Sequence, residues 1–328
     1  PAELDIKMPF SLVNNNLSKD RLEVMPAFWW MYNMYALARN ASKYQQRDKR
    51  FHKIQHIEFD AYAPDTIEEI LSGMNLLELW TAKASLKKQG CSMEGKTDAA
   101  LIQIGRSLLT GNPDVVNSLE VEGEAMEKSK RQVLILKPYK AYHAYRDMLF
   151  HYAMINLIAY FDKHSAATLS SMHAELKGKR QANWVNLGGQ LMQKQACDQL
   201  RSDIVNGSLN SWKDIHDRYD QLWETYPADK QKHAYALLCE LLDTDKLSVE
   251  QWKASLNKAV DIQQFITDQV YITREKDYTN HFRQITFENM EEMTAAIGTI
   301  EDNSFILQTR KDNETFKEKV TGLKNINR

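Results

Sequence analysis

The chain has 328 residues, a formal net charge of −2, 43% hydrophobic residues and 26% charged residues. This balance excludes a disordered chain and gives no overall attraction to nucleic acid or to an anionic membrane. Folds of many strands need frequent turn residues, and this chain has only 12 glycines and 7 prolines. We therefore expect a mainly α-helical, multi-helix bundle with at most one or two short strands.

Three widely spaced cysteines, none of them in a Cys-x-x-Cys motif, are typical of reduced thiols, so we expect a cytoplasmic protein. The most apolar run, residues 148–161, is shorter than the ~20 residues of a membrane span. We therefore expect no membrane partner, and the net charge makes nucleic acid an unlikely partner.

The first segment, residues 1–17, is predicted to be irregular because Pro9 and three consecutive asparagines favour turns. The chain begins at Pro1 without an initiator methionine, so we expect this segment to connect to an upstream region. Residues 26–38 carry no charge and are rich in aromatic side chains, which predicts a buried helix that begins at Pro26.

A basic stretch follows, from Arg39 to Lys53, with Asp48 as its one carboxylate. We interpret it as a solvated helix end, because no matching excess of positive charge exists elsewhere in the chain. An anion or nucleic-acid patch is the alternative.

Residues 52–59 alternate apolar and polar side chains and predict a short strand, while 67–89 and 97–109 predict helices. Between these helices, residues 90–97, GCSMEGKT, match the letters of a phosphate-binding P-loop. A working P-loop follows a buried strand, but the preceding ASLKKQ is a charged helix end. We therefore interpret the glycines as a helix stop and a turn.

Residues 133–136, VLIL, fit either a short strand or the apolar end of a helix. The helix predicted over Pro138–Phe161 starts polar, aromatic and basic, and becomes apolar on every side. A helix that is apolar all round is typical of the middle of a bundle. We therefore expect 26–38 and 138–161 to be two central buried helices.

Further helices are predicted at 166–176, 191–205, 212–224, 229–242, 248–270 and 287–298. A loop is expected at 181–189, a turn at Tyr226-Pro227, and a polar tail from Lys311. The predicted organisation is a connector (1–17), a helical core (18–178) and a C-terminal helical region packed on it (179–328). One continuous domain is the alternative.

His143, Asp147 and His151 are spaced four residues apart on one stripe of the central helix. The favoured interpretation is structural: Asp147 orients His143, and His151 is a satisfied core residue. Two alternatives stay open, a metal ion held by all three side chains and a catalytic acid–base pair formed by His143 and Asp147. The chain has no Glu-x-x-His, HExxH, GxSxG or GxGxxG motif, and no cofactor is identified.

A basic run with interleaved tyrosines opens the central helix, and these side chains suit a phosphate-bearing or sugar ligand. Asn33 lies between aromatic turns of the first buried helix and must find hydrogen-bond partners there. The predicted ligand-binding residues are Arg39, Asn33, Lys137, Lys140, Tyr142 and Arg146. A solvated basic face is the simpler alternative for the run.

Four segments carry a family resemblance: MPFSLVNNNLSKDRLEVMPAFWWMYNMYALARNASKYQQRDKR, AYHAYRDM, NWVNLGGQLM with SWKDIHDRYDQLWETYP, and TREKDYTNHFRQITFEN. Together they span nearly the whole chain. They resemble the C-terminal half of a family of large Bacteroidetes proteins, domain of unknown function 4954 (DUF4954).

The preceding half of that family resembles a left-handed β-helix of hexapeptide repeats, similar to sugar nucleotidyltransferases and acyltransferases. The resemblance implies that residues 1–17 leave such a β-helix and that this β-helix half is a partner of the chain. Because such β-helices commonly trimerise, a homo-oligomer is one arrangement that the resemblance allows. It implies a context of sugar or nucleotide-sugar metabolism and assigns no catalytic residue.

Three hypotheses of function follow. The first is an accessory helical module of a larger β-helix protein that helps to bind a sugar-phosphate or nucleotide-sugar ligand. The second is an enzyme that uses His143 and Asp147 as an acid–base pair or as metal ligands. The third is a purely structural or protein-interaction domain.

Overall fold

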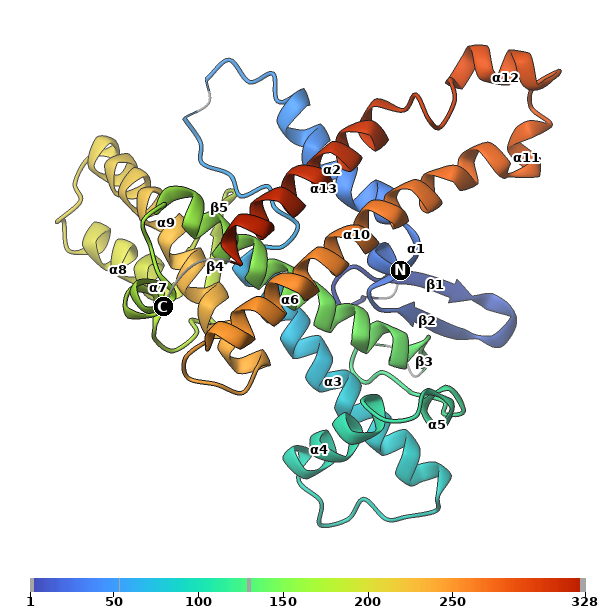
Figure 1. The fold of residues 1–328 in the computed structure, drawn as a ribbon. Helices are drawn as coiled ribbons and strands as arrows, with labels where there is room; N and C mark the ends of the chain where they lie inside the picture. The colour runs from blue at the N-terminus through green and yellow to red at the C-terminus, as the bar shows by residue number, and fades with distance from the viewer. Residues whose placement is uncertain (1–2, 53, 129–130, 325–328) are drawn as a thin grey trace. The chain divides into compact units, whose positions relative to one another are not determined.

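The structure is a computed structural model that describes residues 3–52, 54–128 and 131–324, without the side chains of Ala41 and Gln45. Within these residues it has thirteen α-helices and five short strands in two small sheets (Figure 1). The predicted mainly α-helical class is confirmed, but the strands exceed the one or two expected. The chain divides into two compact units. Unit 1 comprises Pro1–Asn33 and Thr66–Met148, and unit 2 comprises Met34–Asp65 and Leu149–Arg328.

Unit 1 contains a three-stranded sheet of β1 (Leu12–Asn16), β2 (Arg21–Met25) and β3 (Gln132–Ile135), in that order. β1 and β2 form an antiparallel hairpin, and β3 runs parallel to β2. The prediction that residues 1–17 are irregular is therefore wrong for β1. At 133–136, the strand is the correct one of the two interpretations.

Glu23 explains why an asparagine run, normally poor in strands, pairs here. Asn14 and Asn16 on β1 donate side-chain hydrogen bonds to the Glu23 carboxylate on β2, at 3.1 and 2.9 Å. The Arg21 guanidinium donates to the same carboxylate and, with the two amides, holds the pKa of Glu23 below its usual value. These cross-strand bonds supply the side-chain pairing that local propensity lacks.

The helices of unit 1 are α1 (Phe28–Tyr32), α3 (Pro64–Lys88, from Thr66 onward), α4 (Asp98–Leu109), α5 (Pro113–Asn117) and α6 (Pro138–Lys163, up to Met148). The P-loop letters fall between α3 and α4, in the turn that Gly90 opens with φ +67°. Thr97 then caps α4 by accepting a hydrogen bond from the Ala100 N–H. The helix stop and turn predicted there are confirmed.

The helix predicted over 26–38 is interrupted. α1 begins at Phe28 and ends at Tyr32, and α2 (Met34–Arg47) starts after Asn33. Asn33 leaves the helical region with φ −145° and ψ 45°, while its N–H still bonds to the Trp29 carbonyl. Ala27, the residue before α1, has φ 54° and lies in the left-handed region. The helix therefore begins after Ala27, and Pro26 lies outside it.

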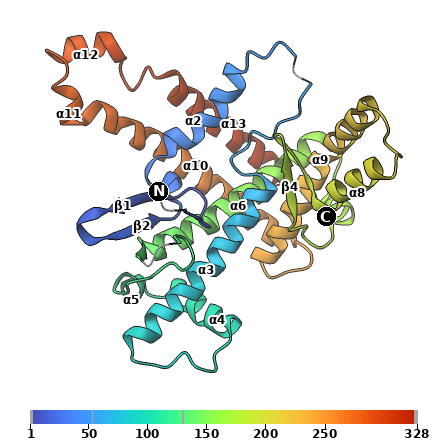
Figure 2. The ribbon, with the colours of Figure 1, turned by 180° about the vertical axis from the view of Figure 1, so that it is seen from behind.

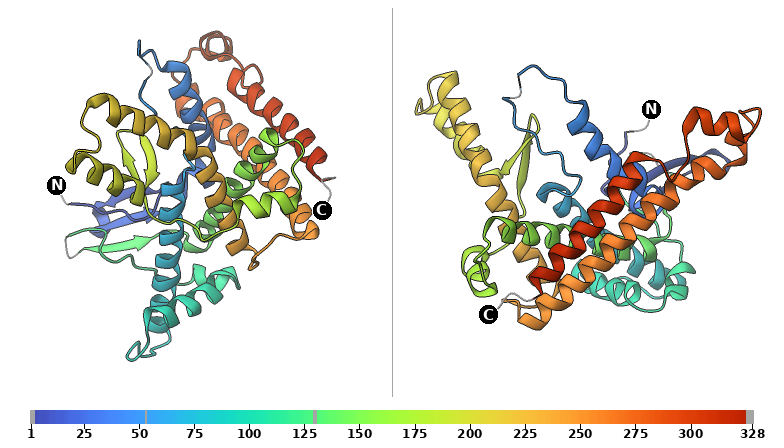
Figure 3. Two further views of the ribbon diagram at one scale, coloured as in Figure 1. Left: turned by 90° about the vertical axis from the view of Figure 1, so that its left-hand side faces the viewer. Right: turned by 45° about the horizontal axis from the view of Figure 1, so that its top comes forward.

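In unit 2, the long helices α2, α10 (Val249–Thr279) and α13 (Ser304–Leu323) lie side by side (Figures 1 and 3). α11 (His281–Gln284) and α12 (Met290–Ile297) connect α10 to α13. The part of α6 from Leu149 onward also belongs to this unit and is mostly buried. In the tail from Lys311, predicted only as polar and charged, residues 311–323 lie within α13, and residues 325–328 lie outside the described residues.

The rest of unit 2 surrounds α9 (Trp212–Leu241), seen from behind in Figure 2. α7 (Leu169–Leu176), α8 (Lys194–Val205) and the second strand of the β4 (Trp184–Leu187)–β5 (Gln190–Gln193) hairpin contact it. In the described part of the chain, no helix is long and apolar enough to cross a membrane.

Three local predictions in unit 2 are wrong. Residues 181–189 contain β4 rather than a loop, and the described residues 52 and 54–59 form no strand. The predicted turn at Tyr226-Pro227 is absent, because α9 continues through Pro227. A proline removes one N–H donor and disfavours the interior of a helix. Here the buried Tyr226 beside it and Lys230 one turn later both bond to Glu58, which fixes this turn from outside the helix.

Candidate ligand-binding cavity

A cavity of about 370 Å³ opens within unit 2 among α2, α6, α10, α13 and the segment 60–62. Its walls are mostly apolar and come from all four helices: Met34, Leu37, Ile155, Ile266 and Phe305. This volume and this lining are those of an ordinary small-molecule site, in which apolar walls surround a few polar groups. We call it the unit 2 cavity.

His151 is a buried titratable group of this cavity. The all-apolar stretch of α6 carries it into the interior, where 7% of its surface is exposed. Burial lowers the pKa of His151 from 6.5 to about 4. The rings of His151 and Tyr62 pack edge to face, with their centroids 5.7 Å apart. The floor of the cavity therefore holds a neutral imidazole at physiological pH.

Polar side chains that can both donate and accept hydrogen bonds also line the cavity, among them Asn156 and Gln308. The Asn156 amide donates to the Tyr152 carbonyl at 2.8 Å, and the Gln308 amide donates to Asp312 Oδ1 at 2.7 Å. The two carboxylates of the lining, Asp60 and Asp312, are exposed and mark the mouth. Among the described residues that line the cavity there is no lysine and no arginine.

The segment that supplies Asp60 and Tyr62 is tied to α9 by a buried cation. Lys230 Nζ lies 2.6 Å from Asp60 Oδ2 and 3.0 Å from Glu58 Oε2. The Tyr226 hydroxyl donates to the same Glu58 oxygen. Because Lys230 and Glu58 are nearly buried, these bonds are shielded from solvent and hold the segment in place.

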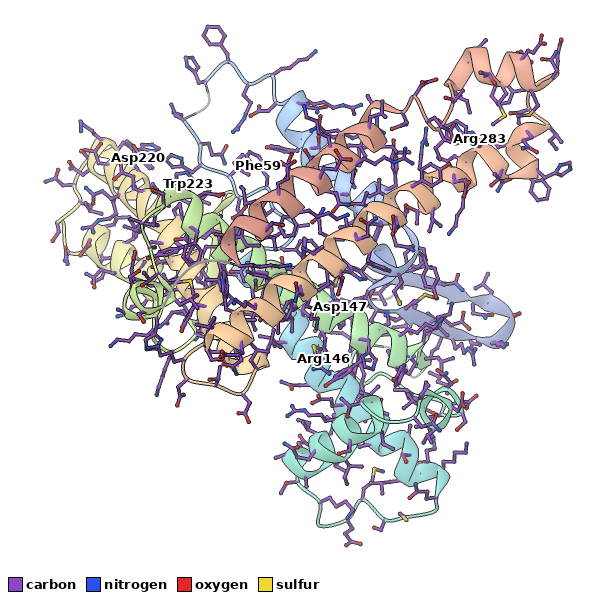
Figure 4. All side chains as sticks on the ribbon, viewed as in Figure 1. Phe59, Arg146, Asp147, Asp220, Trp223 and Arg283 are labelled. Atoms are coloured by element: carbon purple, nitrogen blue, oxygen red, sulfur yellow. The ribbon has the colours of Figure 1, made fainter. Side chains whose placement is uncertain are left out.

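The start of the same segment is held by a second set of contacts (Figure 4). The His56 ring stacks on Trp223 at 5.2 Å, and its Nε2 lies 2.7 Å from Asp220 Oδ1. The Glu58 N–H donates to the Gly189 carbonyl in the β4–β5 turn at 2.9 Å. One side of the cavity is thus positioned before any ligand arrives, which lowers the entropy lost on binding.

The predicted catalytic pair lies in unit 1. His143 Nε2 is 3.0 Å from the Leu109 carbonyl oxygen, which can only accept, so Nε2 carries the proton. The His143 ring also contacts Tyr139, with centroids 4.5 Å apart. Asp147 is half-buried on α6 beside Arg146 (Figure 4). The acid–base role of His143 and Asp147 stays a prediction.

Two of the predicted ligand-binding side chains bond within unit 1. Lys137 Nζ lies 2.7 Å from the Tyr32 hydroxyl and 4.4 Å from the centroid of that ring. The buried Tyr142 hydroxyl donates to Glu78 Oε1 at 2.7 Å, and burial together with Glu78 raises the pKa of Tyr142. These contacts satisfy both side chains inside the protein.

The other predicted ligand-binding residues are dispersed. Lys140 is exposed and Arg146 is half-buried on α6, while Asn33 separates α1 from α2. Arg39 belongs to unit 2, where its guanidinium lies 5.6 Å from the centroid of the Tyr35 ring. Lys130 and Lys53, which belong to the basic stretches of the sequence, lie outside the described residues.

No group of three or more His, Cys, Asp or Glu side chains comes together as a metal site in the described ranges. Of the cavity lining, sequence reasoning singled out His151 alone, from its spacing with His143 and Asp147, and favoured a satisfied core residue there. The side chains of Tyr62 and Asp312 carry no motif, because they meet His151 only through the packing of distant segments.

A protein of similar sequence matches most of the chain. The chain is 37% identical over 318 residues to a protein of Treponema pallidum (strain Nichols) described as "Uncharacterized protein". The match covers 95% of this chain and 41% of that protein, so the chain spans less than half of its relative's length. No family model and no solved structure matches the chain.

Proposed function

We propose that the chain is a ligand-binding helical module and that the unit 2 cavity is its ligand site. The observation that carries this proposal is a cavity of about 370 Å³ whose apolar walls surround the buried, neutral His151. One wall is held in place by the bonds of Lys230 to Glu58 and Asp60. Positioned polar groups in an apolar cavity are the usual features of a small-molecule site.

In this proposal the module is one part of a longer protein. The match to 41% of the Treponema protein supports it, since a region covering nearly all of this chain occurs there within a much longer sequence. This proposal includes membership of DUF4954, an upstream β-helix half and a cytoplasmic location. It also includes the two central helices expected from the sequence and a homo-oligomer formed through the β-helix.

The geometry favours binding over acid–base catalysis at this cavity. A general base works best when its pKa lies near the working pH. His151, with a pKa of about 4, is a weak base at neutral pH and serves better as a hydrogen-bonding group. The enzyme hypothesis concerns His143 and Asp147, which belong to unit 1 and do not line this cavity.

The proposal also includes the sugar-phosphate and nucleotide-sugar ligands expected from the basic run. These ligands would bind in unit 1, outside the unit 2 cavity. They would use Lys140 and Arg146, because Lys137 and Tyr142 already bond to Tyr32 and Glu78. This leaves fewer cations for a phosphate than the sequence suggested. The unit 2 cavity is therefore the better supported site.

The test is to fill the cavity. Ser42 lines it from α2, whereas Asn40 on the same helix is exposed and does not line it. A panel of monosaccharides, sugar phosphates, nucleotide sugars and small aromatic amines is screened against the whole chain by saturation-transfer NMR and thermal shift. Ligands in hundredfold excess over Kd stabilise by ~2.7 kcal/mol.

We expect Ser42→Trp to abolish the signals of compounds that bind the wild type, and Asn40→Trp to keep them. The melting temperature of each variant confirms that it is folded. A panel without a binding compound, or one whose signals all survive Ser42→Trp, would overturn the proposal.

A further inference from the structure

The charge of the cavity lining points to the chemical class of its ligand. We infer that the unit 2 cavity binds a small organic cation, an amine carried on an apolar or aromatic body. This inference rests on the proposed function and deepens it.

The first argument is the balance of charge at the mouth. Both charged residues of the described lining are aspartates, Asp60 and Asp312. Lys230 Nζ lies 2.6 Å from Asp60 and is shared between Asp60 and Glu58. In the ranges that the structure describes, Asp312 receives a hydrogen bond from the neutral Gln308 amide and has no ion-pair partner. The mouth therefore keeps at least the negative charge of Asp312, which no cation of the described residues neutralises.

The second argument concerns the floor. His151 is neutral, so the interior offers an anion no positive charge, and burying an unpaired anion is costly. A carboxylate or phosphate entering this cavity would also meet Asp312, a like charge at short range. An ammonium group instead donates a charge-assisted hydrogen bond to Asp312.

The third argument is the separation of apolar and charged surface. The apolar walls and His151 lie inside, whereas Asp312 is exposed on α13. Phe305 and Tyr62 add aromatic faces, which attract cations. A ligand that buries an apolar body and leaves its ammonium at the mouth satisfies all of these surfaces together.

The experiment compares three probes with one ring and three head groups: tyramine (amine), tyrosol (alcohol) and 4-hydroxyphenylacetate (carboxylate). Dissociation constants are measured on the whole chain by isothermal titration calorimetry and saturation-transfer NMR. We expect tyramine to bind at least about tenfold more tightly than tyrosol, as ~1.4 kcal/mol of charge-assisted bonding predicts. The carboxylate should show no saturation transfer.

Asp312→Asn removes the charge from an exposed position and should bring tyramine to the affinity of tyrosol. Glu314→Gln is the matched control, because Glu314 is an exposed carboxylate of the same helix that does not line the cavity. It should leave the preference for the amine intact.

Two outcomes overturn the inference while sparing the proposed function: equal binding of the three probes with loss in Ser42→Trp, or a preference for the amine that survives Asp312→Asn. Absence of binding by all three probes overturns the inference. The proposed function is overturned as well only if the ligand panel described above also contains no binding compound.

Discussion

Two carboxylates, one in each unit, differ in how their charges are satisfied. In unit 1 the buried Glu78 carboxylate accepts hydrogen bonds from Tyr142 and from two nitrogens of Arg106, at 2.7 to 3.0 Å. In unit 2, Asp312 at the mouth of the cavity has no cation among the described residues. The first arrangement closes on itself and stabilises the fold, whereas the second leaves a charge available to a ligand.

The largest expected effect is at Glu78, whose side chain is 2% exposed. Glu78→Ala leaves Arg106 and Tyr142 without their shared acceptor, so we expect a loss of about 3 kcal/mol in the free energy of unfolding, measured in urea. Glu124→Gln is the control, because its pair with Lys83 is solvent-exposed and should contribute at most about 1 kcal/mol. Equal losses for the two variants would show that the Glu78 cluster is not the stabilising one.

Acid should destabilise unit 2 through His151. The folded pKa, about 4, lies below the unfolded value of 6.5, so the unfolded state binds more protons between these values. The contribution of His151 to the free energy of unfolding is therefore complete above pH 6.5 and falls as the pH drops toward 4. Below pH 4 it stays constant, after a total loss of up to about 3 kcal/mol. Denaturant titrations of wild type and His151→Gln at several pH values isolate this loss.

His52→Gln serves as the control for that pH dependence, since His52 is exposed. Its difference from the wild type should not vary between pH 4 and 6.5. If His151→Gln keeps the full acid slope of the wild type, then His151 is not the group that titrates.

The ion pairs of Lys230 with Glu58 and Asp60 connect the stability of the fold to the cavity wall at residues 60–62. Lys230→Met removes the cation between Glu58 and Asp60, so we expect a loss of about 2 kcal/mol in stability and weaker binding of the probes. Lys213→Met on the same helix is the control, because Lys213 is exposed and pairs with Asp217 near the surface. Unchanged probe affinity in Lys230→Met would mean that the segment does not shape the cavity.

The smallest effect on stability is expected for charge reversal of the basic run, because Lys140 is exposed. Lys140→Glu with Arg146→Glu should leave the tyramine affinity of the chain within about twofold of the wild type. Binding of sugar phosphates to the chain is then compared between the wild type and this double variant. A loss there would locate a phosphate site in unit 1, and no change would remove the basic run from consideration.

Helices with a clear apolar period or a cap were predictable from the sequence. Thr97 and Ser248 cap their helices as polar side chains before apolar runs usually do. The errors arose where distant residues decide the local structure. The strand at Asn14–Asn16 depends on Glu23. The continuation of α9 through Pro227 is accompanied by hydrogen bonds that Tyr226 and Lys230 donate to Glu58.

The candidate cavity was predictable only in part, for the same physical reason. His151 could be found because it is spaced four residues from Asp147 on one stripe of a helix, but that spacing indicated a core residue and no cavity. The identity of its neighbours required the packing of α2, α10 and α13, which no local pattern encodes. Lys137 and Tyr142 had the right chemistry for a ligand, but their partners, Tyr32 and Glu78, lie far away in the sequence.

The contact between α3 and α4 constrains how this sequence can diverge. A Cβ atom at Gly105 would lie 1.7 Å from the Glu78 carbonyl oxygen, so the two helices approach as closely as a bare backbone allows. Any larger residue must push the helices apart and weaken the hydrogen bonds of Glu78 to Arg106. In relatives of this chain, a substitution at position 105 should therefore appear together with a change at 78 or 106. Such paired changes would record how tightly the two helices are held in each lineage.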